Sequence, residues 1–388
     1  MTNIKRNIIF SIISIAFRTT ALLCLTGTLM QTFLEALNIS SKLNYIHTTV
    51  LQAANVTTIL LSSGWTDTGG LFKKAALSQI PMGILFLMYI PFCIGKGFSS
   101  FALLLAIGVI QSVFAGLNTV CEYKIPYFIY RAEDYGLITS IAGVLSAVIT
   151  LGLSALISIL SKYHEYKQIM LFAFVISSLL MITAGILNIY YKSLINTENI
   201  QSSRNPDIKL SEVFSHPSFL HLLIPNIFRG FAYGTVTVLA IVAFDIGFDK
   251  SVTTMMVSVQ TIATLAGCAV YGMSSKLIRP RSCILFGSLT FLLLPLMLIA
   301  NKYVFLTVYA IIFFGRTIVD YAVPPYLLRV VPVEISGQYN AWRMILHNGG
   351  TLIATSVASV LSPIALFAVT IIFQLISGIG FMRFKAKN

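Results

Sequence analysis

The chain has 388 residues, of which 57% are hydrophobic and 10% are charged, and its formal net charge is +13. Soluble domains are about 45–50% apolar and about 25% charged, so this composition excludes a soluble protein and predicts a membrane protein. A positive charge of this size would suggest nucleic acid binding in a soluble protein. Here the basic residues lie in short connections between apolar runs, which is typical of membrane topology. We therefore expect the lipid bilayer, and no nucleic acid, as a partner.

Twelve apolar segments follow one another along the chain, and each is long enough to cross a bilayer as a helix of about 20 residues. Segments this long exclude a lipid-facing β-barrel. The predicted fold is an all-α polytopic membrane protein with 12 transmembrane helices in two pseudo-symmetric six-helix bundles. The bundles are residues 1–191 and 217–388, joined by a polar central loop at 192–216. The twelve segments are about 8–36, 47–64, 76–94, 101–122, 137–160, 168–191, 218–246, 251–274, 282–300, 304–328, 339–361 and 365–382.

The distribution of Lys and Arg predicts how the chain is oriented. Most of these residues fall in connections on the side of the N-terminus, and the positive-inside rule then places both termini and the central loop in the cytoplasm. No cleavable signal peptide is recognisable, and the expected location is a bacterial-type cytoplasmic membrane. The five cysteines lie in or beside apolar runs without a C-x-x-C pair, so neither disulfides nor a metal site is expected.

A charged, proline-containing phrase occurs twice. It reads CEYKIPYFIYRAEDYG at 121–136 and VDYAVPPYLLRVVPVEISG at 319–337, at the inner end of the fourth segment of each half. The repeat extends to the first segment of each half, where Phe-Arg recurs. Internal repeats of this kind are how many secondary transporters are built, with the binding site between the repeats. The matched pairs are Arg18 with Arg229, Glu122 with Asp320, Pro126 with Pro324, and Arg131 with Arg329.

Two turns carry a resemblance to a known family. The turn SGWTDTGGLFKK at 63–74 resembles the motif G-x-x-x-D-[RK]-x-G-[RK]-[RK] of the major facilitator superfamily, with Thr68 in place of the usual basic residue. The equivalent turn of the second half reads GMSSKLIRPR. The resemblance implies alternating access about a midplane site, with these turns acting as an inner gate latch. The residues concerned are Asp67, Gly70, Lys73 and Lys74 in the first turn, and Gly272, Lys276, Arg279 and Arg281 in the second.

Four arginines lie within the predicted spans. Arg18 is about ten residues into its segment, which is roughly 15 Å and near the middle of a core of about 30 Å. Arg229 lies at a similar depth in the seventh segment. A charge inside a span usually faces a cavity or a partner. The two arginines are therefore interpreted as ligands for an anionic group, and the alternative is an internal ion pair that holds helices together.

The other two span arginines each have a polar neighbour one helical turn away. Arg316 and Asp320 are spaced i and i+4, so they share a helix face and are expected to pair. Arg343 and His347 have the same spacing, and Asn118 is the first-half counterpart of Arg316. All of these residues except Asp320 are candidate substrate ligands. The alternatives are a snorkelling Arg343 and a His347 that is a hydrogen-bonded core residue.

Four acidic residues lie toward the ends of spans, and we interpret them as gate partners or proton sites. Glu122 and Asp320 lie toward the inner ends, where Arg131, Arg329 or the turn lysines are expected partners. Glu35 and Asp245 lie toward the outer ends. Proton coupling requires an acid that burial keeps protonated, and Asp320, followed by Glu35, fits that role best.

These features together predict a secondary active transporter. No phosphate loop and no catalytic or metal-ligand constellation is present, so an enzyme or an ATP-driven pump is not expected. The span arginines outnumber midplane acids, which favours a small anionic or polar solute, with a proton gradient and no cofactor as the driver. The alternatives are an efflux pump for drugs or amphipathic compounds, and a membrane sensor without transport. A monomer is expected.

Overall fold

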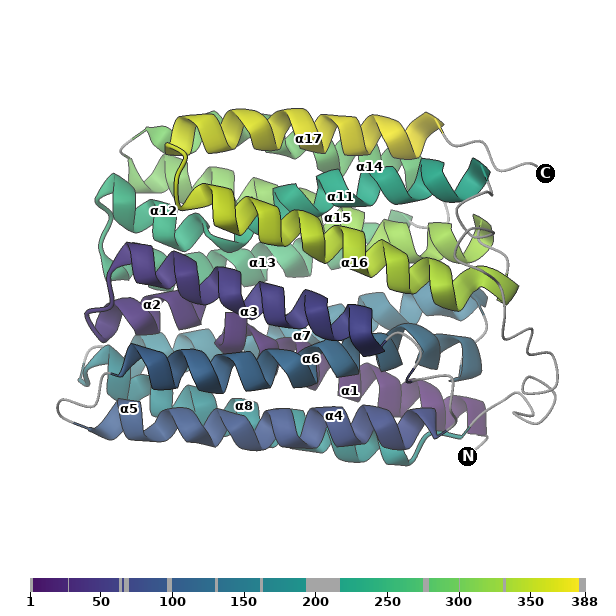
Figure 1. Ribbon diagram of the computed structural model, residues 1–388, viewed down its shortest axis with the longest axis horizontal. Coiled ribbons are helices and arrows are strands. Elements are labelled where there is room, and N and C mark those ends of the chain that lie inside the picture. The colour runs from purple at the N-terminus through teal and green to yellow at the C-terminus, as the bar shows by residue number, and fades with distance from the viewer. Residues whose placement is uncertain are drawn as a thin grey trace.

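The described part of the protein is a long bundle of helices, shown in Figure 1. The structure is a computed structural model, and no strand is assigned in the part of the chain that it describes. The helices of the first half gather on one side of the bundle and those of the second half on the other. The described residues are 3–26, 28–62, 65, 70–95, 100–129, 132–160, 163–192, 217–274, 279–299, 301–330 and 333–383.

All twelve predicted segments are helical where the structure describes them, and several consist of two or three consecutive helices. The N-terminal half contains α1 (Asn3–Thr26), α2 (Thr28–Ala36), α3 (Ser41–Ser62), α4 (Leu71–Phe86), η2 (Leu87–Tyr89), α5 (Ile90–Ile94), α6 (Phe101–Ile129), α7 (Ala132–Leu160) and α8 (Tyr166–Ile189). The C-terminal half contains α11 (Pro217–Thr237), α12 (Leu239–Ile246), α13 (Lys250–Ser274), α14 (Pro280–Leu289), η3 (Thr290–Leu298), α15 (Lys302–Val330), α16 (Val333–Ala358) and α17 (Pro363–Arg383).

The breaks within and between spans have local causes. Pro91 occupies the first turn of α5, where the missing amide hydrogen costs no helical bond. The seventh span is bent by 46° between α11 and α12, at Val238. Gly247 ends α12 with φ of 100°, and Gly70 precedes α4 with φ of 68°. Both glycines hold the left-handed conformation that L-residues with a Cβ adopt only with strain.

Two spans differ from the others in polarity. By length and composition, nine described helical segments can cross a membrane, and the bent pair α11–α12 makes ten. The remaining two, α3 and α16, carry several polar residues and pack against each other across the two halves. Asn348 Nδ2 of α16 donates a hydrogen bond of 3.3 Å to Asn55 Oδ1 of α3. Their lower hydropathy therefore reflects protein rather than lipid around part of their surface.

Each half has its own apolar core. In the N-terminal half, Phe33, Phe86 and Phe174 are fully buried together with aliphatic residues of the same helices. In the C-terminal half the corresponding cluster includes Phe291 and Phe305. The halves meet along α3 against α16 and α7 against α13. α1 begins and α17 ends at one end of the bundle (Figure 1), which we call the terminal end.

Candidate functional site

Two ion pairs, one in each half, connect the first span of that half with its fourth. Arg18 of α1 pairs with Glu122 of α6, and Arg229 of α11 pairs with Asp320 of α15. The four residues are the two arginines and two acids that the sequence repeat matches with each other. The structure therefore joins them in the same way in both halves. For both arginines it shows the internal ion pair that the sequence analysis gave as the alternative to binding an anionic group.

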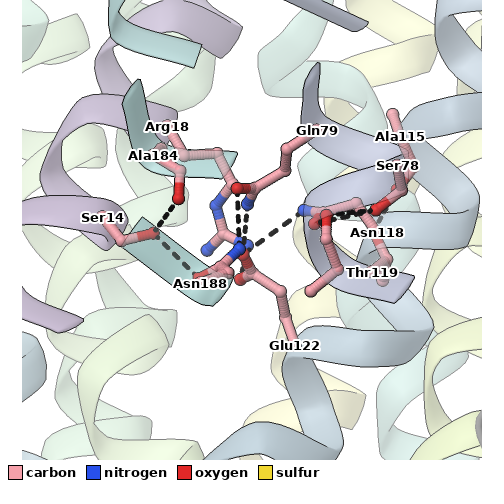
Figure 2. Close-up of polar contacts among 11 residues, drawn as sticks. Ser14, Arg18, Ser78, Gln79, Ala115, Asn118, Thr119, Glu122, Ala184 and Asn188 are labelled. Carbon is pink, nitrogen blue, oxygen red and sulfur yellow. Dashed lines mark hydrogen bonds and ion pairs between the residues drawn. The ribbon is translucent and has the colours of Figure 1, made fainter. Parts of the chain in front are cut away.

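The first pair is embedded in a network of neutral polar side chains (Figure 2). Glu122 Oε1 accepts hydrogen bonds from Gln79 Nε2 at 3.0 Å and from Asn118 Nδ2 at 3.3 Å. Gln79 Oε1 accepts from Asn188 Nδ2 at 2.8 Å, and Asn188 Oδ1 accepts from Ser14 at 3.3 Å. The network ties α1, α4, α6 and α8 together, so the carboxylate has donors besides its guanidinium partner.

The second pair has more charge around it. Asp320 Oδ1 accepts hydrogen bonds from Arg229 and, at 2.5 Å, from the hydroxyl of Tyr233. Arg316 Nε lies 3.6 Å from the other carboxylate oxygen, so the pairing expected from the i, i+4 spacing is present. The ring of Tyr233 lies 4.9 Å from the guanidinium of Arg229 and 4.3 Å from that of Arg316. The ring of His347 meets the same ring edge-on at 5.0 Å.

The second site has an excess of positive charge, whereas the Arg18–Glu122 pair is neutral. Arg229, Arg316 and Arg343 all lie within electrostatic range of His347, and Asp320 is the acid that pairs with two of these arginines. The side chain of Asp320 is 37% exposed and that of Arg316 is 26% exposed, although both lie well inside α15. These charges are therefore only partly covered by protein.

The buried nitrogen atoms of this site without a hydrogen-bond partner among the described residues include Nε of Arg229 and Nδ1 of His347. Buried polar atoms in proteins are nearly always paired, with protein groups, water or a ligand. The site thus has hydrogen-bonding capacity that the described side chains do not use.

The sequence suggested Arg131 and Arg329 as partners of Glu122 and Asp320, and Arg131 and the side chain of Arg329 lie outside the described residues. The structure shows a partner for each acid that the sequence did not suggest, an arginine about midway along the first span of the same half. Each of these ion pairs joins two helices of one half, so the described contacts of the two pairs stabilise the halves separately.

The first gate turn is described in part. Asp67 lies outside the described residues, and Gly70 sits at the start of α4 in the left-handed conformation. Lys73 is exposed. Lys74 donates a hydrogen bond of 2.5 Å to the carbonyl oxygen of Trp65, and its amino group lies 5.4 Å from the centre of the indole ring. The hydrogen bond between Lys74 and Trp65 therefore joins the two ends of the turn.

The second gate turn contributes one close approach between the halves. Lys276 lies outside the described residues. Gly272 of α13 faces Ser140 of α7, and a Cβ on the glycine would lie 3.7 Å from the serine Cβ. Arg279 precedes α14 with extended backbone, and Arg281 lies in the first turn of that helix. The glycine therefore lies at the contact between α7 and α13, which belong to different halves.

The two remaining acids lie at the end opposite to the terminal end. Asp245 of α12 accepts a hydrogen bond of 3.1 Å from the hydroxyl of Tyr45, which belongs to α3 of the other half. Gln31 of α2 donates to the carbonyl oxygen of Thr237 at 2.6 Å and forms a second link between the halves. An open hollow nearby is lined by Glu35, Phe244, Phe248, Asp249 and Ser251.

The sequence analysis named Asn118 and His347 but missed other uncharged members of the two sites. Tyr233 lies four residues after Arg229 on α11, so the same i, i+4 spacing that linked Arg316 with Asp320 could have identified it. Gln79 and Asn188 are single polar residues inside apolar spans, and such residues in membranes generally have partners. The charged residues drew attention because they are rare, although the neutral residues complete the hydrogen bonding.

Comparisons with known proteins agree with this architecture. A crystal structure of a D-xylose-proton symporter matches with a TM-score of 0.71 and 10% identity over 100% of both chains. A crystal structure of a bacterial homologue of the iron transporter ferroportin, in an outward-facing state, matches with a TM-score of 0.68 and 11% identity over 99% of both chains. No curated protein matches the sequence. The family model of the Major Facilitator Superfamily matches residues 8–355, and the chain belongs to this superfamily of membrane transporters.

Proposed function

We propose that the protein is a secondary active transporter that moves a small anionic or polar solute across a bacterial cytoplasmic membrane. The observation that carries this proposal is the excess of guanidinium groups among the described residues of the second site. Two arginines pair with one carboxylate there, and a third, Arg343, lies within electrostatic range of the neighbouring His347. A partly covered site of this charge attracts anions and repels cations. Arginine also suits carboxylate and phosphate groups because its planar donors match their oxygen atoms.

Alternating access is the expected mechanism. Each half is held together internally by its own ion pair and apolar core. The described polar contacts between halves include single hydrogen bonds such as Tyr45–Asp245 and Asn348–Asn55. Breaking a few such bonds costs little relative to disrupting a core, so the halves can move as units. The termini would lie in the cytoplasm, and the protein would act as a monomer.

The proposed driver is a proton gradient, with Asp320 as the proton acceptor. Its carboxylate is accessible while the arginine beside it is buried. A proton can therefore reach the acid, and a protonated acid would release its two arginines for a substrate anion. We propose no enzymatic activity and no bound cofactor.

The test is solute uptake by proteoliposomes containing the purified protein. An imposed inward proton gradient should drive accumulation of labelled anionic metabolites, and Arg229→Gln should abolish it. Lys42→Gln is the control, because it removes an exposed amino group at the start of α3 and should leave uptake intact.

Three outcomes of this experiment would contradict the proposal. Accumulation of lipophilic cations that is unaffected by Arg229→Gln would support the efflux alternative. Flux of anions without any response to the proton gradient would exclude proton coupling. Absence of both flux and counterflow for all solute classes would support a sensor.

A further inference from the structure

The carboxylate of Asp320 is held as a bound ligand would be. Three donors converge on it: the guanidinium of Arg229, the hydroxyl of Tyr233 at 2.5 Å, and Nε of Arg316 at 3.6 Å. The first two contact Oδ1 and the third lies near Oδ2, so both oxygens of one planar group are engaged. The arrangement has the donor set of a carboxylate receptor.

The two donors of α11 are positioned by close packing of that helix on α16. A Cβ on Gly230 would collide with the carbonyl oxygen of His347, and one on Gly234 would collide with Thr351. Thr351 Oγ1 also donates a hydrogen bond of 3.0 Å to the carbonyl oxygen of Gly230. Arg229 directly precedes Gly230 and Tyr233 directly precedes Gly234, so helix packing fixes the backbone from which both donor side chains extend.

The described residues of the first half form no equivalent receptor, although the repeat gives that half the same ion pair. Leu22 stands four residues after Arg18, where the second half has Tyr233 four residues after Arg229. Asn118 stands where the second half has Arg316. The carboxylate of Glu122 is therefore held by one guanidinium and by neutral amides. The donors that distinguish the second half are the ones expected at a binding site.

We propose that Asp320 occupies the place of the substrate's own carboxylate. Arg229, Tyr233 and Arg316 form a receptor for one planar carboxylate group, and the substrate fills it when Asp320 is protonated and moves aside. This inference rests on the proposed function and narrows its substrate class to organic carboxylates.

The charge balance sets the number of protons. Around Asp320 lie Arg229 and Tyr233 from α11, Arg316 from its own helix and Cys268 from α13, with His347 and Arg343 of α16 beside them. If a carboxylate enters and one proton binds to Asp320, the net charge of the site is unchanged. Uncompensated charge inside a membrane protein is costly, so one proton should enter with each carboxylate. A phosphate dianion would need two.

The test uses the space that truncation of Asp320 leaves. Asp320→Ala removes the carboxylate, and formate has the size of the group removed. Formate should raise the melting temperature of this variant in detergent by several degrees with saturation, because a ligand that binds the native state stabilises it. Sodium phosphate and sodium chloride at equal ionic strength should not. Tyr233→Phe in the same background should weaken the effect.

The matched control is Asp245→Ala. It also removes a carboxylate that accepts a tyrosine hydrogen bond, but its described partner is Tyr45 rather than arginines. Formate should not stabilise it. Equal stabilisation of both variants, equal effects of phosphate and formate, or no effect of formate on Asp320→Ala would overturn the proposal.

A second variant covers the case in which Asp320→Ala does not fold. Asp320→Asn keeps the shape of the protonated acid, so its affinity for formate should not depend on pH. The affinity of the unmodified protein should rise up to tenfold for each unit by which the pH falls, because one proton binds with each anion. Equal pH dependence in the two proteins would overturn the proposal. These measurements need no flux, so their failure is distinguishable from failure of transport.

Discussion

Neutralising Glu122 should destabilise the protein more than neutralising both members of its ion pair. Glu122→Gln keeps the shape of the side chain and an oxygen that can accept from Gln79 and Asn118. It leaves the guanidinium of Arg18 without its counter-charge near the middle of the membrane. Arg18→Gln combined with Glu122→Gln removes both charges, so this penalty is absent from the double variant.

The size of the effect follows from the position of Arg18. A charged side chain at the centre of a span costs at least about 2.5–3.5 kcal/mol on insertion scales. The side chain of Arg18 keeps 16% of its surface exposed, which places the expected loss near the lower figure. At about 2–4 °C for each kcal/mol in a unit the size of one half, Glu122→Gln should lower the melting temperature by roughly 5–10 °C.

The assay is thermal unfolding of the purified protein in detergent, followed with a thiol-reactive fluorescent dye. Cys93, Cys121, Cys268 and Cys283 are free and buried, so the dye reports the loss of the fold. All four proteins of the double-mutant cycle are compared under the same conditions. The reasoning is refuted if the double variant is less stable than Glu122→Gln, or if the two single effects simply add.

Three further predictions concern packing, backbone conformation and the arginine cluster. Gly230→Ala should lower the melting temperature by several degrees because its Cβ meets the backbone of α16, whereas Gly349→Ala, with nothing within 4 Å, should not; equal effects would argue against the close approach. Gly70→Ala should cost about 1 kcal/mol in the same assay because φ is 68°, and Gly70→Asn should cost less. Arg316→Lys should raise the KM for anion uptake several-fold, since lysine lacks the planar group that stacks on Tyr233; an unchanged KM would exclude that role.

The fold was predictable because it depends on properties that act along the chain. Long apolar runs specify helices that cross the bilayer, and this holds even for α3 and α16, whose polar residues leave them below the composition limit for a span. The sequence repeat also matched residues that are equivalent in the structure. It matched Arg18 with Arg229 and Glu122 with Asp320, and in each half the structure pairs the arginine with the acid.

The partners within the site were harder to predict because they depend on which helices are neighbours. The sequence indicates that a charge in a span needs a partner, but the partners it suggests for Glu122 are residues close to it in sequence or in the turns. The partner that the structure shows, Arg18, lies on another helix, and only the tertiary arrangement brings it near. Tyr233 was not predicted because its side chain is neutral. A neutral polar side chain costs much less free energy in a membrane than a charged one, so its place in a span did not by itself indicate a partner.

The pairing of α3 with α16 has a consequence for biosynthesis. Asn55 and Asn348 are separated by 293 residues, so α3 enters the membrane long before the helix that covers its polar side has been made. During that interval Asn55 Oδ1 lacks the donor that Asn348 later supplies, and lipid provides no water in its place. Chains that terminate before α16 should therefore be recognised by membrane proteases, and the first half expressed alone should accumulate only when the second half is supplied in the same cell.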